Sequence, residues 1–326
     1  MKIIFGTYTK RVSQGIYTAD FDQGRLSNLE LRFPLVNPTY FARMDHTMLA
    51  VSQKDKQGGI ACFEHGQFVN DVMQEGSTPC YVSVVKEKNL VLSANYHLGN
   101  IITYAYTPKK GIRLIQKIDY GTGSHAHYIR YIKQLDEVLV SDLGLDRIVA
   151  YTIDSYLMLH PKYTFSAKPG QGPRHLVVHP NKPVIYSFCE LSSELLVLAH
   201  DGYGLRQVQC LSTLPDNEQA IKSGSAIRID LKGKFIYVAN RGHDSITVFE
   251  LDETGKHAKF IQNIKSEGIH PRDFNLSPDG KYLVVVHKDS DNAVVFTIDP
   301  HTGKLTLLNK DFIVPEAVCV EFVDHA

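Results

Sequence analysis

Histidines, arginines and carboxylates recur in this chain beside turns that separate short apolar, β-branched runs. Before such runs stand His125, His127, Arg174, His175 and Arg272, and after them stand Asn95, Asp142, Glu190, Asn240, Arg241 and His287. Guanidinium groups bind anions, and imidazole and carboxylate groups exchange protons near neutral pH. Gathered in one place, these residues would form an anion-binding pocket with acid–base capability.

Several of these side chains also have a simpler structural interpretation. Asp142 and Asn240 follow strand-like runs, where Asp and Asn commonly hydrogen-bond to the backbone of a turn. His175 fits internal packing as well as function. His125 and His127 share one face of a strand, as two metal ligands would, but a zinc or iron site needs a further ligand. Because nearby arginines would also repel a cation, we expect no metal and no other cofactor.

The three arginines point more directly to an anionic ligand. A guanidinium group in a crowded position needs a carboxylate or phosphate partner. Around Arg174, Arg241 and Arg272, the expected acidic partners are only Asp142 and Glu190. The sequence therefore predicts a small anionic substrate.

The elements that must position these residues form a repeat. Residues 226–249 contain three strand-like runs separated by a Lys-Gly-Lys turn and an Asn-Arg-Gly-His-Asp turn, which is typical of antiparallel hairpins. The same layout recurs about every 47 residues, in the range of four-stranded propeller blades. The first strands of the seven units are expected at Tyr40, Tyr81, His127, His175, Ala226, Asp273 and Ala317.

The two ends of the chain are incomplete in complementary ways. After Ala317 there is room for one strand, at about residues 317–323, whereas residues 2–33 supply three strands without a first. Pairing the ends in one sheet closes the ring and removes an open edge. We therefore predict an all-β, seven-bladed β-propeller with four antiparallel strands per blade, forming a single domain over residues 1–326.

This architecture explains why distant residues would converge. In each blade the first strand lines the axis and the second returns antiparallel beside it. The start of the first strand and the end of the second therefore lie at the same rim. All the polar residues described above occupy one of these two positions.

Composition excludes several other classes of protein. The 326 residues contain 35 Lys+Arg and 35 Asp+Glu, so we expect no nucleic-acid partner. No apolar run approaches the length of a membrane span, and the N-terminus lacks a signal-peptide core. Five widely spaced cysteines are expected as buried, reduced thiols. We predict a cytoplasmic protein that is a monomer or weak homodimer.

The motifs around these residues resemble the seven-bladed propeller lactonase family, which contains propeller-type 6-phosphogluconolactonases and carboxy-cis,cis-muconate cyclases. The motifs are His125-Ala126-His127, residues 142–147, Gly172-Pro173-Arg174-His175, residues 240–245, and residues 270–274 with Ser277-Pro278-Asp279-Gly280. The resemblance implies that His127, Arg174, Glu190 and Arg241 are catalytic. The chain departs from it at Ser52-Gln53, at Cys189 and at residues 133–136.

The first functional hypothesis is a metal-independent lactonase that hydrolyses 6-phosphoglucono-1,5-lactone to 6-phosphogluconate in the pentose phosphate pathway. The remaining rim residues would bind the substrate: His125, His175, Asn240, Arg272, Asp142 and His287. The same pocket would also suit a lactonizing isomerase that closes a muconate carboxylate onto a double bond. A third hypothesis is a non-catalytic propeller that binds another protein.

Overall fold

The computed structural model describes residues 1–215 and 221–323 and divides the chain into two compact units. One unit is Leu35–Arg174, and the other comprises Met1–Pro34 with His175–Ala326. Both are built from antiparallel sheets of four strands. Among the described residues there are seven such sheets.

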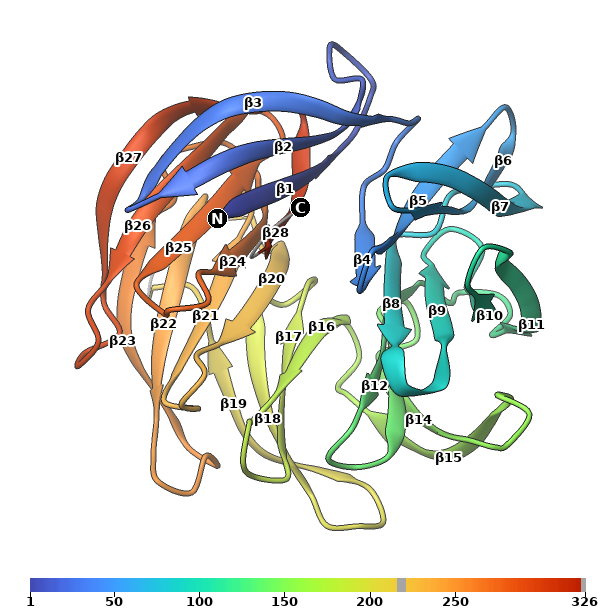
Figure 1. Ribbon diagram of the computed structural model, residues 1–326. Coiled ribbons are helices and arrows are strands. Elements are labelled where there is room, and N and C mark those ends of the chain that lie inside the picture. Colours follow the sequence, from blue (N-terminus) through green and yellow to red (C-terminus); the bar gives the residue numbers. More distant parts are fainter. Residues whose placement is uncertain (216–220, 324–326) are drawn as a thin grey trace. The chain divides into compact units, whose positions relative to one another are not determined.

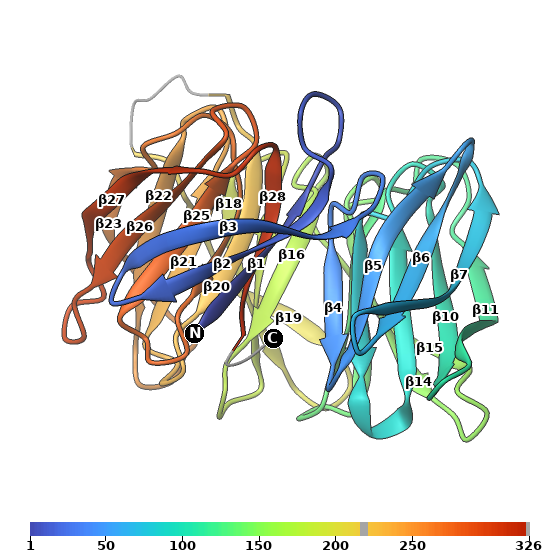
Figure 2. The ribbon, with the colours of Figure 1, turned by 45° about the horizontal axis from the view of Figure 1, so that its top comes forward.

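The unit Leu35–Arg174 contains three sheets, in which the strands lie side by side in chain order; the sheet of β4, β5, β6 and β7 can be followed in Figure 2. The first has β4 (Phe41–Met44), β5 (Thr47–Lys54), β6 (Gln57–Glu64) and β7 (Gln67–Glu75). The second has β8 (Tyr81–Val85), the 3-10 helix η1 (Lys86–Lys88), β9 (Leu90–Asn95), β10 (Asn100–Thr107) and β11 (Gly111–Asp119). The third has β12 (Ala126–Ile132), β13 (Glu137–Asp142), β14 (Arg147–Ile153) and β15 (Leu159–Ser166).

The second unit contributes three sheets of the same kind and one that joins the two chain ends. The first has β16 (Pro173–Val178), β17 (Val184–Cys189), β18 (Glu194–His200) and β19 (Leu205–Ser212). The next has β20 (Gly224–Ile229), β21 (Phe235–Asn240), β22 (Ser245–Leu251) and β23 (Ala258–Lys265). The third has β24 (Pro271–Leu276), β25 (Tyr282–His287), β26 (Asn292–Ile298) and β27 (Leu305–Ile313). Each predicted first strand begins within two residues of its observed start.

The last sheet confirms the predicted closure between the chain ends. Its strand order is β28 (Ala317–Val323), β1 (Lys2–Thr7), β2 (Gly15–Asp22) and β3 (Arg25–Pro34). β28 pairs antiparallel with β1, with Phe5 opposite Val320, and Figure 1 shows both ends of the chain in this sheet. The C-terminal strand thus supplies the first strand that the N-terminal segment lacks.

The apolar core lies between neighbouring sheets because the inner strands are apolar on both faces. Between β20–β23 and β24–β27, for example, Tyr237, Phe249, Phe274 and Phe296 are fully buried in one cluster. The fourth strand of a sheet is more exposed to solvent than the inner strands. In β27, for example, most residues are exposed. Each sheet therefore has a buried inner part and a solvated outer edge.

The pairing of β1 with β28 predicts that side chains of β1 form part of the apolar core. Ile3 is 0% exposed and packs in the cluster that includes Val284 and Val320. We expect Ile3→Val to lower the free energy of unfolding by about 1 kcal/mol, since a buried methylene is lost. The matched change Ile313→Val, at a side chain 61% exposed, should have almost no effect. Equal effects in urea unfolding would contradict the closure.

A bulge recurs near the start of the first strand. The antiparallel pairing skips His127 in β12, Arg272 in β24 and Val318 in β28. A bulge re-aims a side chain relative to the regular alternation of a strand. The fold therefore turns His127 and Arg272, two of the predicted site residues, out of the normal strand register.

Two further features bear on the sequence predictions. Cys62, Cys189 and Cys319 are buried as expected, whereas Cys80 and Cys210 are only partly buried. Among the described residues, we find no helix with the length and apolar character that a membrane crossing requires.

Candidate active site

The predicted site residues are distributed over both compact units. Leu35–Arg174 contains His125, His127, Asp142 and Arg174, and the other unit contains His175, Glu190, Asn240, Arg241, Arg272 and His287.

Glu190 and Arg241 form an ion pair at the ends of neighbouring second strands. Glu190 directly follows β17 and Arg241 directly follows β21. Arg241 Nη2 lies 2.9 Å from Glu190 Oε2 and also donates to the Gly224 carbonyl oxygen at 2.6 Å. Both side chains remain partly accessible, at 10% for Arg241 and 19% for Glu190. An accessible guanidinium–carboxylate pair can bind an anion and also exchange a proton.

Gly224 makes this close arrangement possible. A Cβ atom at Gly224 would lie 2.6 Å from the Cys189 carbonyl oxygen. Its N–H donates to the Glu190 carbonyl oxygen at 2.9 Å. The sequence feature that allows Glu190 and Arg241 to meet is therefore a glycine that the sequence analysis did not single out.

His175 is a buried, neutral neighbour of this pair. Burial holds the pKa of its imidazole well below the usual value, and the positive charges of Arg228 and Arg241 lower it further. The side chain is 5% exposed. At neutral pH His175 therefore adds no positive charge, and the cations beside it are arginines.

His287 and a second histidine, His270, lie around the start of β24 and the end of β25. His287 is fully buried, with Nδ1 3.2 Å from the Asn292 carbonyl oxygen. His270 Nδ1 lies 3.3 Å from Asp289 Oδ2. Burial is the main cause that lowers the pKa of each imidazole to about 4. Both histidines are therefore neutral at pH 7.

The sequence analysis missed His270 as a site residue. It directly precedes β24, just as His125 directly precedes β12. Applying the same positional rule to every blade would have found it. The charge of Arg241 also contributes to the lowered pKa of His270, which places the two residues in one electrostatic neighbourhood.

Arg272 presents a donor that nothing in its surroundings satisfies. Within residues 1–215 and 221–323, its Nη1 atom is buried and has no hydrogen-bond acceptor. A buried donor without an acceptor is costly. This arrangement favours an anionic ligand at Arg272.

In the unit Leu35–Arg174, two predicted histidines gather around Tyr96. The His125 ring stacks on Tyr96 with centroids 4.2 Å apart, and its Nδ1 lies 2.9 Å from the Tyr96 carbonyl oxygen. The His127 ring meets the same tyrosine edge-on at 5.9 Å. His127 and Arg174 are both buried, at 4% and 2% exposure. Tyr96 directly follows β9, and an aromatic residue at this position gives no charged or polar signal in the sequence.

Asp142 and Asn240 support turns, as one of the two sequence interpretations expected. Asp142 is fully buried, accepts the His125 N–H at 2.9 Å and pairs with Arg147 at 3.1 Å. Asn240 is also fully buried and bonds to Thr213 and Thr247. Direct contact of either residue with a substrate stays a prediction.

The described parts of the chain contain no group of three or more His, Cys, Asp or Glu side chains that could hold a metal ion. In the unit that contains Glu190, the candidate residues are arginines, the neutral histidines His175, His270 and His287, and the carboxylate of Glu190. These groups can bind an anionic, oxygen-rich substrate and move its protons. Independence of a metal remains a prediction.

Comparison with known proteins agrees with this chemistry. Residues 2–322 match the family model described as "Lactonase, 7-bladed beta-propeller". A 6-phosphogluconolactonase of Bacillus subtilis is 35% identical over 98% of this chain and 97% of its own length. This chain also resembles the crystal structure of a Lactobacillus plantarum protein, at 35% identity and a TM-score of 0.95, with 99% of each chain covered.

A third similar protein is a periplasmic gluconolactonase of Pseudomonas aeruginosa. Its structure is 25% identical, covers 99% of this chain and 98% of its own, and gives a TM-score of 0.90. The seven sheets observed here match the seven blades that the family description names. With nearly its whole length matched by the family model, this chain belongs to the seven-bladed β-propeller lactonase family.

Proposed function

We propose that the protein hydrolyses 6-phosphoglucono-1,5-lactone to 6-phosphogluconate without a metal ion. The observation that carries the proposal is the accessible Glu190–Arg241 pair at 2.9 Å in a member of the lactonase family. The name of the Bacillus subtilis relative supports the phosphorylated lactone as substrate.

We further propose that the seven sheets close into one ring and form a single domain. In such a ring, the starts of the first strands and the ends of the second strands share one rim. His127 and Arg174 would then lie together with Glu190 and Arg241. His125, His175, Arg272 and His287 would surround them as substrate-binding residues.

The reaction requires a base and a donor for the oxyanion. Water attacks the lactone carbonyl carbon and the base takes a proton from that water. The bond between the carbonyl carbon and the ring oxygen then breaks, and the protonated base returns its proton to the ring oxygen, which becomes a hydroxyl group. His127 or Glu190 would act as the base. Arg174 or Arg241 would stabilise the oxyanion, an interaction worth about 3–4 kcal/mol per donor. Glu190 could equally act by orienting Arg241, and their ion pair supports that alternative.

Arg272 would bind the phosphate group. A guanidinium group can make two parallel hydrogen bonds to phosphate oxygens. The buried Nη1 atom without an acceptor among the described residues supports this role. A phosphorylated sugar substrate also fits our prediction of a cytoplasmic protein in the pentose phosphate pathway, either a monomer or a weak homodimer.

A lactone-hydrolysis assay tests the proposal directly. We expect turnover of 6-phosphoglucono-1,5-lactone well above the spontaneous rate, and no turnover of carboxy-cis,cis-muconate. The product 6-phosphogluconate, at about 100 times its Kd, should stabilise the fold by about 2.7 kcal/mol. Preferential turnover of the muconate would identify the cyclase activity instead. Neither turnover nor a thermal shift at millimolar concentrations would favour a protein-binding platform.

A further inference from the structure

A buried carboxylate, Glu316, holds the loop between β1 and β2 in one conformation. Its Oε1 accepts the Lys10 N–H at 3.0 Å. Its Oε2 accepts the N–H groups of Arg11, Val12 and Ser13 at 2.9, 3.1 and 3.1 Å. Burial alone would raise the pKa of Glu316, but these donors hold it below the usual value. Four backbone donors on one carboxylate make residues 10–13 a preorganised segment.

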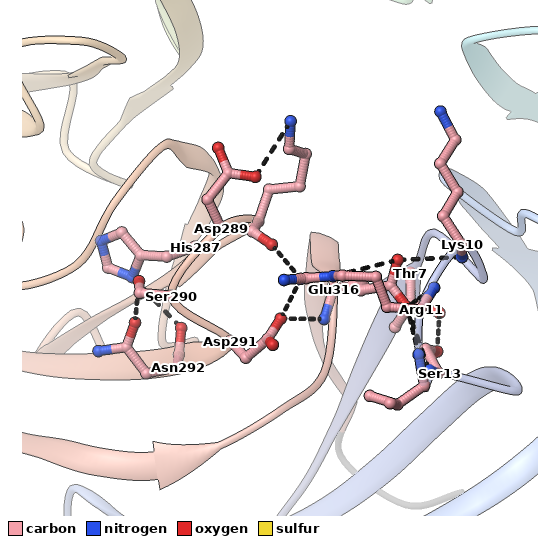
Figure 3. A network of polar contacts seen from close by, with 12 residues as sticks. Thr7, Lys10, Arg11, Ser13, His287, Asp289, Ser290, Asp291, Asn292 and Glu316 are labelled. Atoms are coloured by element: carbon pink, nitrogen blue, oxygen red, sulfur yellow. Dashed lines mark hydrogen bonds and ion pairs between the residues drawn. The ribbon is translucent and has the colours of Figure 1, made fainter.

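Arg11 ties the same loop to the turn after β25, as Figure 3 shows. Its Nη2 donates to Asp291 Oδ1 at 2.6 Å and to the Lys288 carbonyl oxygen at 2.9 Å. Asp291 Oδ1 in turn accepts the Glu316 N–H at 2.7 Å. Three segments far apart in the sequence therefore form one rigid polar framework.

This framework lines an open pocket of about 330 Å³. Its lining residues are Tyr8, Lys10, Arg11, Lys288, Asp289 and Glu316. A volume of this size accepts a phosphate group with the carbon that carries it. Which ligand the pocket can bind depends on which of its charged side chains already form ion pairs.

Three cations and three carboxylates meet around the pocket, and the cations differ in whether they form an ion pair. Asp291 pairs with Arg11, and Asp289 lies 3.2 Å from Lys288 Nζ. Lys10 Nζ lies 4.8 Å from the centre of the Tyr8 ring, and no ion pair to it occurs in the described part of the chain. The Glu316 carboxylate accepts the four backbone N–H groups and also lies 3.8 Å from Arg11 Nε. The pocket therefore offers the Lys10 ammonium group, which has no carboxylate partner among the described residues, beside the paired cations Arg11 and Lys288, and such a group can bind a compact anion.

Hydrogen bonds connect this pocket to the rim that carries Glu190 and Arg241. Each step joins the start of a first strand to the end or following turn of a second strand. The steps are Gly224 N to Glu190 O, Arg241 N to Ser223 O, His270 N to Asp244 Oδ1, Lys288 N to His270 O, Glu316 N to Asp291 Oδ1 and Tyr8 N to Glu316 O. The pocket and the Glu190–Arg241 pair therefore lie on the same rim of this unit. Arg272 stands on that rim two residues after His270.

We propose that this pocket receives the phosphate group of the lactone, that Lys10 and Lys288 determine specificity for the phosphorylated substrate, and that Glu316 positions the loop carrying Lys10. The inference rests on the proposed function. Arg272, which lies in the first strand β24, would bind the same phosphate group from that strand. Glucono-1,5-lactone, which lacks the phosphate, would leave the pocket without its ligand.

The test is a comparison of kcat/KM for 6-phosphoglucono-1,5-lactone with that for glucono-1,5-lactone. Loss of a charged hydrogen-bond donor costs about 10- to 100-fold in affinity. We expect Lys10→Ala and Lys288→Ala to lower the ratio of the two kcat/KM values by that factor, mainly through KM. Lys10→Arg should keep most of the ratio. Lys259→Ala, which removes an exposed lysine from β23, should leave the ratio unchanged.

Glu316→Gln tests the positioning role separately. The amide keeps the size of the side chain but replaces one acceptor oxygen with a donor that opposes the backbone N–H groups. We expect the ratio to fall in the same direction as in Lys10→Ala. A lower melting temperature with an unchanged ratio would show that Glu316 is only structural and would overturn this part of the proposal.

Product binding separates failure of this inference from failure of the proposed function. Thermal shifts with 6-phosphogluconate and with gluconate need no catalysis. We expect stronger stabilisation by 6-phosphogluconate in the wild type, and loss of that preference in Lys10→Ala. If the wild type hydrolyses the phosphorylated lactone but Lys10→Ala and Lys288→Ala keep the wild-type ratio, the pocket assignment is wrong and the activity stands. If 6-phosphogluconate is preferred but neither lactone is hydrolysed, the proposed function fails and the pocket remains.

Discussion

Glu190→Gln is expected to lower kcat for 6-phosphoglucono-1,5-lactone by about 10²–10⁴-fold, the range of a positioned general base. The melting temperature should stay nearly unchanged. The expected loss of kcat has a physical reason: the Glu190 carboxylate is partly accessible to a substrate and lies 2.9 Å from Arg241. Whether Glu190 acts as the proposed base or orients Arg241, its role would require the negative charge that the amide lacks. Glutamine keeps the size of the side chain and an oxygen that can accept a hydrogen bond from Arg241 Nη2, so the fold should lose little stability.

Steady-state kinetics with a thermal melt checks this prediction. The matched control is Glu250→Gln, which removes the charge of an exposed glutamate that pairs with Lys234 at 3.7 Å. It should change neither kcat nor the melting temperature. Wild-type kcat in Glu190→Gln would show that the role assigned to Glu190 is wrong. A combined loss of kcat and of folded protein would indicate a structural role instead.

Lowering the pH from 7.5 to 5 should reduce the free energy of unfolding by about 4 kcal/mol. His270 and His287 have pKa values of about 4 in the fold, against about 6.5 in the unfolded chain. Between these values the unfolded state binds protons that the folded state does not, so stability falls as the pH falls. Each histidine contributes about 2 kcal/mol over this interval. His175, whose pKa is also well below the usual value, adds to the loss.

The charges around these histidines agree with this direction. Lys288 and Arg241 oppose protonation of His270, while Asp289 and Asp244 favour it less strongly than burial disfavours it. For His287, Asp244 favours protonation and His270 opposes it. At both positions burial therefore lowers the pKa more than the nearby carboxylates raise it, and the imidazole stays neutral at pH 7.

Urea unfolding at several pH values between 7.5 and 5 measures this effect. His287→Asn keeps a donor near the Asn292 carbonyl oxygen and should reduce the pH dependence by about 2 kcal/mol, the contribution of one histidine. His301→Asn, at an exposed histidine, should keep the full dependence. The prediction fails if the wild type is equally stable at pH 7.5 and pH 5.

Neutral histidines also shape the proposed site. Because His175, His270 and His287 carry no charge at pH 7, the positive charge around Glu190 comes from arginine and lysine side chains. A guanidinium group stays charged at every physiological pH. Binding of an anionic substrate would therefore persist over a pH range in which the histidines remain available as hydrogen-bonding groups.

Much of the fold could be predicted from the sequence because the repeat is local. Turn residues such as Pro278-Asp279-Gly280 separate β-branched runs, and this pattern requires only neighbours along the chain. The pairing of β28 with β1 was also predictable, because residues 2–33 and 317–323 each lack what the other supplies. The ends of second strands likewise identified Glu190 and Arg241 as candidates.

What the sequence determined by itself was therefore the order of strands, the closure of the last sheet and the positions from which polar residues enter the site. Only the tertiary structure decided which of these residues touch. Gly224 allows Glu190 to reach Arg241, bulges turn His127 and Arg272 out of register, and Glu316 captures a loop more than 300 residues away. The physical reason is that strands follow from local turn chemistry and alternation, whereas burial, pKa values and loop contacts depend on segments that meet only in the folded chain.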